Sequence, residues 1–149
     1  MSESVTENLL AKFNEENILR VTDENNASSV LTEMYSDQSW SNDLDGVPKI
    51  NAIINSFTRM RFLDQNGVCN FTEKNAPREV SDSLTPWFMS EDMKIKDKNI
   101  FFGHWSSLGE FCHENISCLD AGCVWGGEMI AIDLDEPQKK IKYKSSISR

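Results

Sequence analysis

Residues 47–71 read VPKINAIINSFTRMRFLDQNGVCNF and carry the clearest helical signal in the chain. Apolar side chains recur there at steps of three and four residues, at Ile50, Ile53, Ile54, Phe57 and Met60. This spacing predicts one apolar stripe on an α-helix that begins just after Pro48, since proline is tolerated where a helix starts. The following Gln65-Asn66-Gly67 predicts a tight turn into a short strand over residues 68–71.

The remainder of the chain is predicted to consist mainly of short strands. They cover residues 99–102, 116–119, 128–134 and 139–144. Apolar side chains fall on both alternations of residues 128–134, so both faces of that strand are expected to be covered. In the last strand, Ile141 and Tyr143 alternate with lysines, which is typical of an edge strand protected by charge. A turn or short helix is predicted for Pro86 to Met89.

The net charge of −9 is concentrated at one end of the 149-residue chain. Residues 1–45 hold ten acidic and two basic side chains, whereas residues 46–149 hold fourteen acidic and thirteen basic ones. The acidic segment argues against nonspecific binding to nucleic acid or to an anionic membrane, because like charges repel. We expect an acidic helical arm (residues 1–45), a main folded part (residues 46–144) and a frayed tail (residues 145–149).

The sequence favours a cytoplasmic protein. No apolar run approaches the ~20 residues that cross a bilayer, and residues 1–16 lack the basic and apolar regions of a signal peptide. The four cysteines are therefore expected to be reduced and mostly buried. A zinc site is the sharper alternative, because Cys112, His113, Cys118 and Cys123 fall within twelve residues. However, no Cys-x-x-Cys pair occurs, and the adjacent Cys112 and His113 would be strained as ligands of one tetrahedral ion.

Two segments of the predicted strand region could carry chemistry. In Phe101-Phe102-Gly103-His104-Trp105, a predicted strand ends at His104 and places an imidazole where functional sites are often assembled. A lone histidine in this position is, however, more often structural. The other histidine, His113, is expected on a loop. In Leu119 to Gly127, a strand ends in Asp120 and is followed by a glycine-rich loop in which Trp125 could stack on a purine. The plainer interpretation is a strained turn whose tryptophan covers the core.

A third candidate is the pair of arginines at the end of the predicted helix, Arg59 and Arg61. Guanidinium groups bind phosphate oxygens in a bidentate manner, but these two could equally be solvated residues at a helix end, where the dipole favours cations. Residues i and i+2 diverge by about 200° on a helix, so both can reach one anion only if the helix ends between them.

These segments, in this order and with these separations, resemble the carboxyl half of the symmetrical bis(5′-nucleosyl)-tetraphosphatases. The matching residues are Met34-Tyr35, Trp40-Ser41, Ile53 to Phe62, Pro86 to Phe88, Phe102 to Leu108 and Leu119 to Gly127. The resemblance covers roughly residues 27–140. It implies an α+β fold, namely the carboxyl-terminal portion of a calcineurin-like metallophosphoesterase with a four-layer αββα sandwich, to which residues 46–144 would contribute.

The resemblance also implies an activity and a set of site residues. The family hydrolyses diadenosine tetraphosphate symmetrically to two ADP with two divalent metal ions, of the manganese or cobalt type. His104 matches a late histidine that coordinates one metal, and Arg59 and Arg61 fall in a segment suited to polyphosphate contact. The residues expected to border the substrate are Asp120, Gly122, Trp125 and Gly126.

The sequence departs from the family in lacking most metal-binding motifs. Gly-Asp-x-His-Gly, Gly-Asp-x-x-x-x-Arg-Gly, Gly-Asn-His-Asp and His-Ala-Gly are all absent from the 149 residues. A two-metal site needs about six to eight protein ligands, and His104 alone is recognisable, so the isolated chain is expected to be inactive and marginally folded. The leading hypothesis is a truncated or split enzyme, whose missing amino-terminal half would be a partner if separately encoded. The alternative is a non-catalytic nucleotide-binding or regulatory module.

Overall fold

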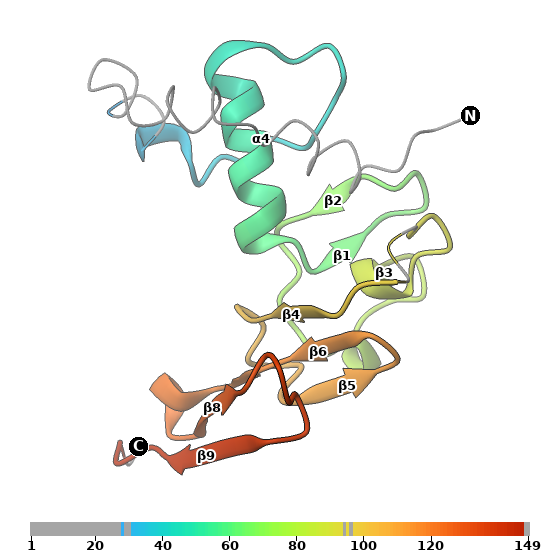
Figure 1. The fold of residues 1–149 in the computed structure, drawn as a ribbon. Helices are drawn as coiled ribbons and strands as arrows, with labels where there is room; N and C mark the ends of the chain where they lie inside the picture. Colours follow the sequence, from blue (N-terminus) through green and yellow to red (C-terminus); the bar gives the residue numbers. More distant parts are fainter. Residues whose placement is uncertain (1–27, 29–30, 94, 96, 148–149) are drawn as a thin grey trace. The chain divides into compact units, whose positions relative to one another are not determined.

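The computed structural model describes residues 28, 31–93, 95 and 97–147, which form two compact units (Figure 1). Among these residues, unit 1 contains those up to 73 and those from 81 to 95, and unit 2 contains residues 74–80 and those from 97 onward. A helix and three small sheets confirm the α+β class. Residues 1–27, 29 and 30 of the predicted acidic arm lie outside the described residues, as do residues 148 and 149 of the predicted tail.

The predicted helix of unit 1 is α4 (Gly46–Arg59), which begins two residues before Pro48. Its first turn accommodates the proline, since the missing N–H has no partner to lose there. Ile50 and Ile53 are buried at 6% and 2% exposure, as their spacing predicts, and Ala52, which is not part of the predicted stripe, is buried at 0%. Phe57 was expected on the same stripe but is 49% exposed, because the buried part of the helix ends at Ser56.

The sheet of unit 1 has the strand order β2-β1-β3, and both pairings are antiparallel. Its strands are β1 (Phe62–Leu63), β2 (Cys69–Asn70) and β3 (Thr85–Pro86). The predicted turn between β1 and β2 is confirmed: Gly67 adopts a φ of +75°, and Asp64 Oδ1 accepts hydrogen bonds from the N–H groups of Asn66 and Val68. The bond from Val68 is the main cause that lowers the pKa of Asp64. A 3₁₀ turn, η2 (Trp87–Met89), confirms the predicted short helix.

The first sheet of unit 2 has the order β4-β6-β5. Its strands are β4 (Ile100–Phe102), β5 (Phe111–His113) and β6 (Ile116–Cys118), and β4 runs parallel to β6. β4 and β6 confirm two predicted strands, whereas β5 was missed. The expectation that His113 lies on a loop is wrong, because residues 111–113 pair with β6 through a turn in which Glu114 has a φ of +50°.

The second sheet of unit 2 has the order β7-β8-β9 and is antiparallel. Its strands are β7 (Asp120–Ala121), β8 (Glu128–Ile132) and β9 (Lys140–Lys144), with η1 (Pro77–Glu79) and η3 (Cys123–Trp125) as short 3₁₀ turns elsewhere in the unit. β9 lies at the edge of this sheet, as its sequence predicted.

Trp105 anchors the interior of unit 2. Its side chain is 1% exposed, and its Nε1 donates a hydrogen bond to the backbone oxygen of Asn75 at 3.1 Å. Ile116 and Cys118 of β6 are also buried. This packing fixes the chain immediately after His104. Within the residues placed by the structure, no helix is long and apolar enough to cross a membrane.

Candidate functional site

The carboxyl ends of β4 and β6 meet at one edge of their sheet and bring two predicted site residues together. Because the strands are parallel, with Phe102 opposite Cys118, the residues that follow them emerge side by side. The N–H of Leu119 donates to the backbone oxygen of Phe102 at 2.9 Å. A Cβ built on Gly103 would lie 3.8 Å from the Cβ of Asp120. The segments that contain His104 and Asp120 are thus neighbours, although they are sixteen residues apart in sequence.

An open hollow of about 420 Å³ lies at this edge. It is lined by Phe101, Phe102, Gly103, His104, Leu119 and Asp120. The imidazole-bearing residue is exposed, and its backbone has a φ of +60°, a left-handed conformation that is uncommon for residues with a side chain. Strain of this kind concentrates at functional sites, where the surrounding structure enforces it. Here the buried side chain of Trp105 supplies the anchor directly after the strained residue.

Asp120 begins a tight glycine loop that leads to β8. Its Oδ1 accepts a hydrogen bond from the N–H of Gly122 at 3.1 Å, and Gly122 has a φ of +69°. Gly126 has a φ of +89° and ends the η3 turn. At Gly127 a Cβ would lie 1.9 Å from the backbone oxygen of Ala121, so this position has no room for any side chain. The glycines predicted from sequence therefore shape the loop itself.

Trp125 does not cover the core, contrary to the plainer interpretation of its sequence. Its side chain is 58% exposed on the η3 turn, and the neighbouring Val124 is 66% exposed. Both residues lie on the short loop between Asp120 and β8. An exposed indole in this position has the flat apolar face that a stacking contact with a base requires.

The structure shows Arg59 engaged within unit 1. Its Nη1 donates to the backbone oxygen of Ser36 and to Asn55 Oδ1, each at 3.1 Å, and its Nη2 lies 3.0 Å from Asp37 Oδ1. The guanidinium also stands 5.1 Å from the ring centroid of Phe71 and 5.7 Å from that of Tyr35. These contacts provide protein partners for the Arg59 guanidinium in the absence of a ligand.

Arg61 is more deeply buried than its sequence position suggests, at 9% exposure. The helix ends at Arg59, and Met60 is extended with a ψ of 125°, so the helix does terminate between the two arginines. Arg61 Nη1 donates to the backbone oxygen of Arg59 at 3.4 Å. Both arginines belong to unit 1, whereas His104, Asp120 and the glycine loop belong to unit 2.

The donor groups of the described residues do not fit a two-metal centre. No group of three or more His, Cys, Asp or Glu side chains among them could hold a metal ion. The hollow offers one imidazole and one carboxylate, His104 and Asp120, fewer than two metals require.

The zinc alternative fails on geometry as well. Cys112 is paired with Ser117, and Cys118 follows Ser117 on β6, so the two cysteine side chains point to opposite faces of the sheet. All four thiols are free. Burial raises the pKa of the Cys69 thiol to about 11 and raises that of Cys118 as well, which keeps both protonated and unreactive.

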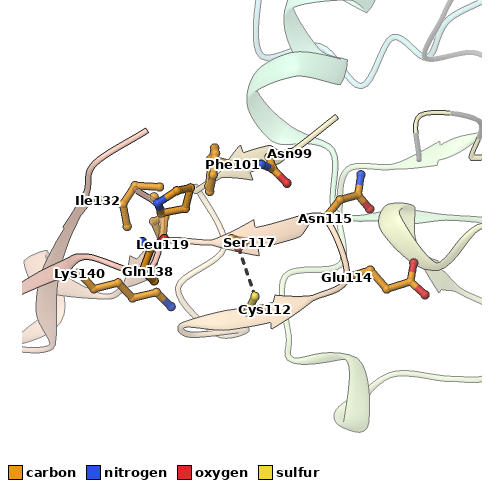
Figure 2. A pocket seen from close by; sticks show the side chains of 11 residues that line it. Asn99, Phe101, Cys112, Glu114, Asn115, Ser117, Leu119, Ile132, Gln138 and Lys140 are labelled. Atoms are coloured by element: carbon orange, nitrogen blue, oxygen red, sulfur yellow. Dashed lines mark hydrogen bonds between the residues drawn. The ribbon is translucent and has the colours of Figure 1, made fainter. Parts of the chain in front are cut away.

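A second hollow, of about 340 Å³, lies between the two sheets of unit 2 (Figure 2). Phe101, Ser117 and Cys112 line it from neighbouring strands of one sheet, and Ile132 and Lys140 line it from the other. Ser117 Oγ lies 3.5 Å from Cys112 Sγ, the interaction drawn in Figure 2. Sequence reasoning missed this hollow because its lining comes from strands that are paired across the sheet and are not adjacent in the chain.

Comparison with known proteins gives relatives that share one name. No protein-family model matches the chain. The chain is 45% identical over 105 residues to a protein of Methylococcus capsulatus named symmetrical bis(5′-nucleosyl)-tetraphosphatase, a match that covers 69% of this chain and 38% of that protein. Proteins with the same name from Vibrio cholerae and Pseudomonas syringae are 41% and 38% identical over 105 and 116 residues, and the chain covers 39% and 40% of them.

The chain therefore spans about two fifths of the length of the curated relatives it matches. Over the matched residues it is a relative of the symmetrical bis(5′-nucleosyl)-tetraphosphatases and corresponds, as its sequence predicted, to their carboxyl-terminal part.

Proposed function

We propose that this chain forms part of an enzyme that hydrolyses diadenosine tetraphosphate symmetrically to two ADP. The observation that carries the proposal is the hollow lined by both His104 and Asp120, because it lies within unit 2 at the carboxyl ends of two parallel strands. Relatives with 36–45% identity bear the name of this activity, which supports the same substrate class here. The four free thiols fit the reducing cytoplasm expected for such an enzyme.

In this proposal the hollow is one wall of the catalytic site. His104 would be the metal ligand supplied by this chain, and Asp120, Gly122, Gly126 and Trp125 would border the nucleotide. Two manganese- or cobalt-type ions would need further ligands. These would come from the part of the enzyme that corresponds to the segment of the relatives outside the match. That part would also complete the four-layer αββα sandwich. The chain alone is accordingly inactive.

A chimera tests the proposal directly. The residues of this chain would replace the matching segment of the Methylococcus capsulatus relative, and ADP release from diadenosine tetraphosphate would be measured with manganese and with cobalt. We expect an active chimera and an inactive isolated chain. His104→Ala should abolish activity, whereas the control His113→Ala, an exposed residue on β5, should leave it nearly unchanged.

Three results would contradict this proposal. Hydrolysis by the isolated chain would show that its own residues suffice for catalysis. Comparable losses for the two histidine variants would show that the site has been misplaced. A chimera that folds but has no activity would refute the proposed reaction.

The exposed Trp125 favours a second candidate, a nucleotide-binding module without catalysis. Such a module would bind through stacking and would need no metal. Titration of the purified chain with ADP and with diadenosine tetraphosphate, in the presence of a metal chelator, separates the two. Binding that Trp125→Ala removes supports the module, and no binding at millimolar nucleotide rejects it.

A further inference from the structure

The sheet β7-β8-β9 exposes an apolar face. In the register of the hairpin, Met129 is opposite Tyr143 and Ala131 is opposite Ile141. These four residues share one side of the sheet with Asp120, which is paired with Met129, because side chains alternate along a strand; we call this side the outer face. Met129, Ile141 and Tyr143 are 60%, 73% and 68% exposed, and Ala131 is exposed too. The expectation that both faces of this strand are covered therefore fails here for one of them.

The opposite side of the same hairpin is occupied within unit 2. Ile130 and Ile132 are partly buried there. Lys140 Nζ lies 3.0 Å from Glu110 Oε1, and Lys142 also pairs with Glu110, which precedes β5. Ile132 and Lys140 line the hollow of Figure 2 together with residues of β4 and β6. The hairpin thus directs its lysine-bearing side toward the neighbouring sheet.

This orientation is the reverse of what an exposed antiparallel sheet normally shows. Such sheets place apolar residues toward the core and polar residues toward water. Here the lysines of β9 contact a carboxylate of the same unit, and the apolar side chains face outward. Adjacent exposed apolar side chains of this kind are typical of an interaction surface.

We propose that the outer face is the docking surface for the portion of a symmetrical tetraphosphatase that this chain does not match, whether joined to it or separate. The chain covers only 38–41% of the relatives, so in each of them roughly three fifths of the protein lies outside the matched segment. The net charge of residues 46–149, which contain this face, is only −1, so charge repulsion does not exclude a second copy, and sedimentation of the chain alone distinguishes it. The inference rests on the proposed function for the identity of the partner.

Binding measurements with matched variants test this surface. The amino-terminal portion of the Methylococcus capsulatus relative, up to the matched segment, would be titrated into the full chain by calorimetry. Ile141→Lys places a charge on the outer face and should weaken binding at least about tenfold. The control is Leu134→Lys: it makes the same charge change at a residue that is 71% exposed but lies beyond the end of β8, outside the paired hairpin, and it should change affinity less than about twofold.

Oxidation of Met129 provides a second readout on the unmutated chain. Dilute peroxide should convert this exposed methionine to its sulfoxide, and bound partner should slow that reaction, as measured by mass spectrometry of the peptide. Protection of Met129 together with the loss caused by Ile141→Lys supports the proposal.

Other outcomes would overturn it. Equal affinities for the two lysine variants, or no binding to the unmutated chain, would exclude the outer face as the docking surface. Sedimentation of the chain alone as a dimer that Ile141→Lys dissociates would assign the surface to a second copy. If the complex forms through the outer face but does not hydrolyse diadenosine tetraphosphate, only the proposed reaction is refuted. If the chimera is active and Ile141→Lys does not change its activity, only this inference is refuted.

Discussion

Replacing Arg59 by methionine tests whether its guanidinium stabilises unit 1 or is available to a phosphate. The substitution keeps an unbranched apolar stem and removes every polar contact of the side chain. In the structure these contacts are hydrogen bonds to Ser36 and Asn55, an ion pair with Asp37 and a cation–π contact with Phe71. A side chain with this many contacts, only 15% exposed, should contribute substantially to stability.

The contacts differ in what they contribute. Asn55 is fully buried, so the loss of its donor leaves Oδ1 unpaired at a cost of about 1–3 kcal/mol. The contact with the buried Phe71 contributes about 1 kcal/mol. The pair with Asp37, whose side chain is 58% exposed, contributes at most about 1 kcal/mol. Loss of the hydrogen bond from Arg59 to Ser36 costs little, because the backbone oxygen of Ser36 still accepts a hydrogen bond from Asn55 Nδ2 at 2.6 Å.

We therefore expect Arg59→Met to lower the free energy of unfolding of unit 1 by about 3 kcal/mol. With urea slopes of roughly 1.5–3 kcal/mol per molar, the midpoint should fall by about 1–2 M. Circular dichroism at 222 nm follows this transition, since α4 is the longest helix among the described residues. Arg78→Met is a control for the loss of an exposed arginine, placed in unit 2: its side chain is 86% exposed and lies 3.7 Å from one carboxylate, so the loss of unfolding free energy should stay below about 0.5 kcal/mol.

Equal and small losses for the two variants would refute this reasoning. The guanidinium of Arg59 would then be dispensable for the fold. In the active chimera, a raised KM for Arg59→Met with unchanged stability would return the residue to the substrate-binding role predicted from its sequence.

Two further predictions concern unit 2. Gly127→Ala should destabilise the unit by about 2–3 kcal/mol, because its Cβ would overlap the backbone oxygen of Ala121. The control Gly103→Ala has no contact closer than 3.8 Å and should be nearly neutral. Equal melting temperatures for the two variants would contradict the steric argument. Hydrogen bonds from two lysines of β9 hold the pKa of Glu110 below its ordinary value of 4.5, so its stabilisation is present above that value and is lost as the pH falls through the lowered pKa. Glu110→Gln should abolish that acid-dependent loss of stability, which is below about 1 kcal/mol for a partly exposed pair. Thermal melts of the unmutated chain and the variant between about pH 2 and 7 measure it. The same pH dependence in the two proteins would disprove the prediction.

Much of the local structure could be predicted from the sequence. The three- and four-residue spacing around Ile53 predicted α4, and the Asn66-Gly67 dipeptide predicted the turn between β1 and β2. Both depend on interactions between residues that are close in the chain. β5 was missed because three residues contain too little alternation to predict a strand, and its pairing with β6 is a tertiary contact.

The candidate site was predicted as separate residues but not as an arrangement. The sequence singled out His104, Asp120 and the glycine loop, and the parallel pairing of β4 with β6 brought the first two to one hollow. It could not predict that Arg59 is engaged by Asn55 and Asp37, because those partners are defined by how α4 packs on the preceding loop.

The sequence by itself determined the helix, most of the strands, the family resemblance and the shortage of metal ligands, since each depends on the order, spacing or number of residue types. The tertiary structure alone decided which residues meet at the hollow, which arginine contacts are satisfied and which face of the last hairpin is exposed. Those features depend on distances between residues far apart in the chain, and alternation along a strand specifies two faces without specifying which one faces the neighbouring sheet.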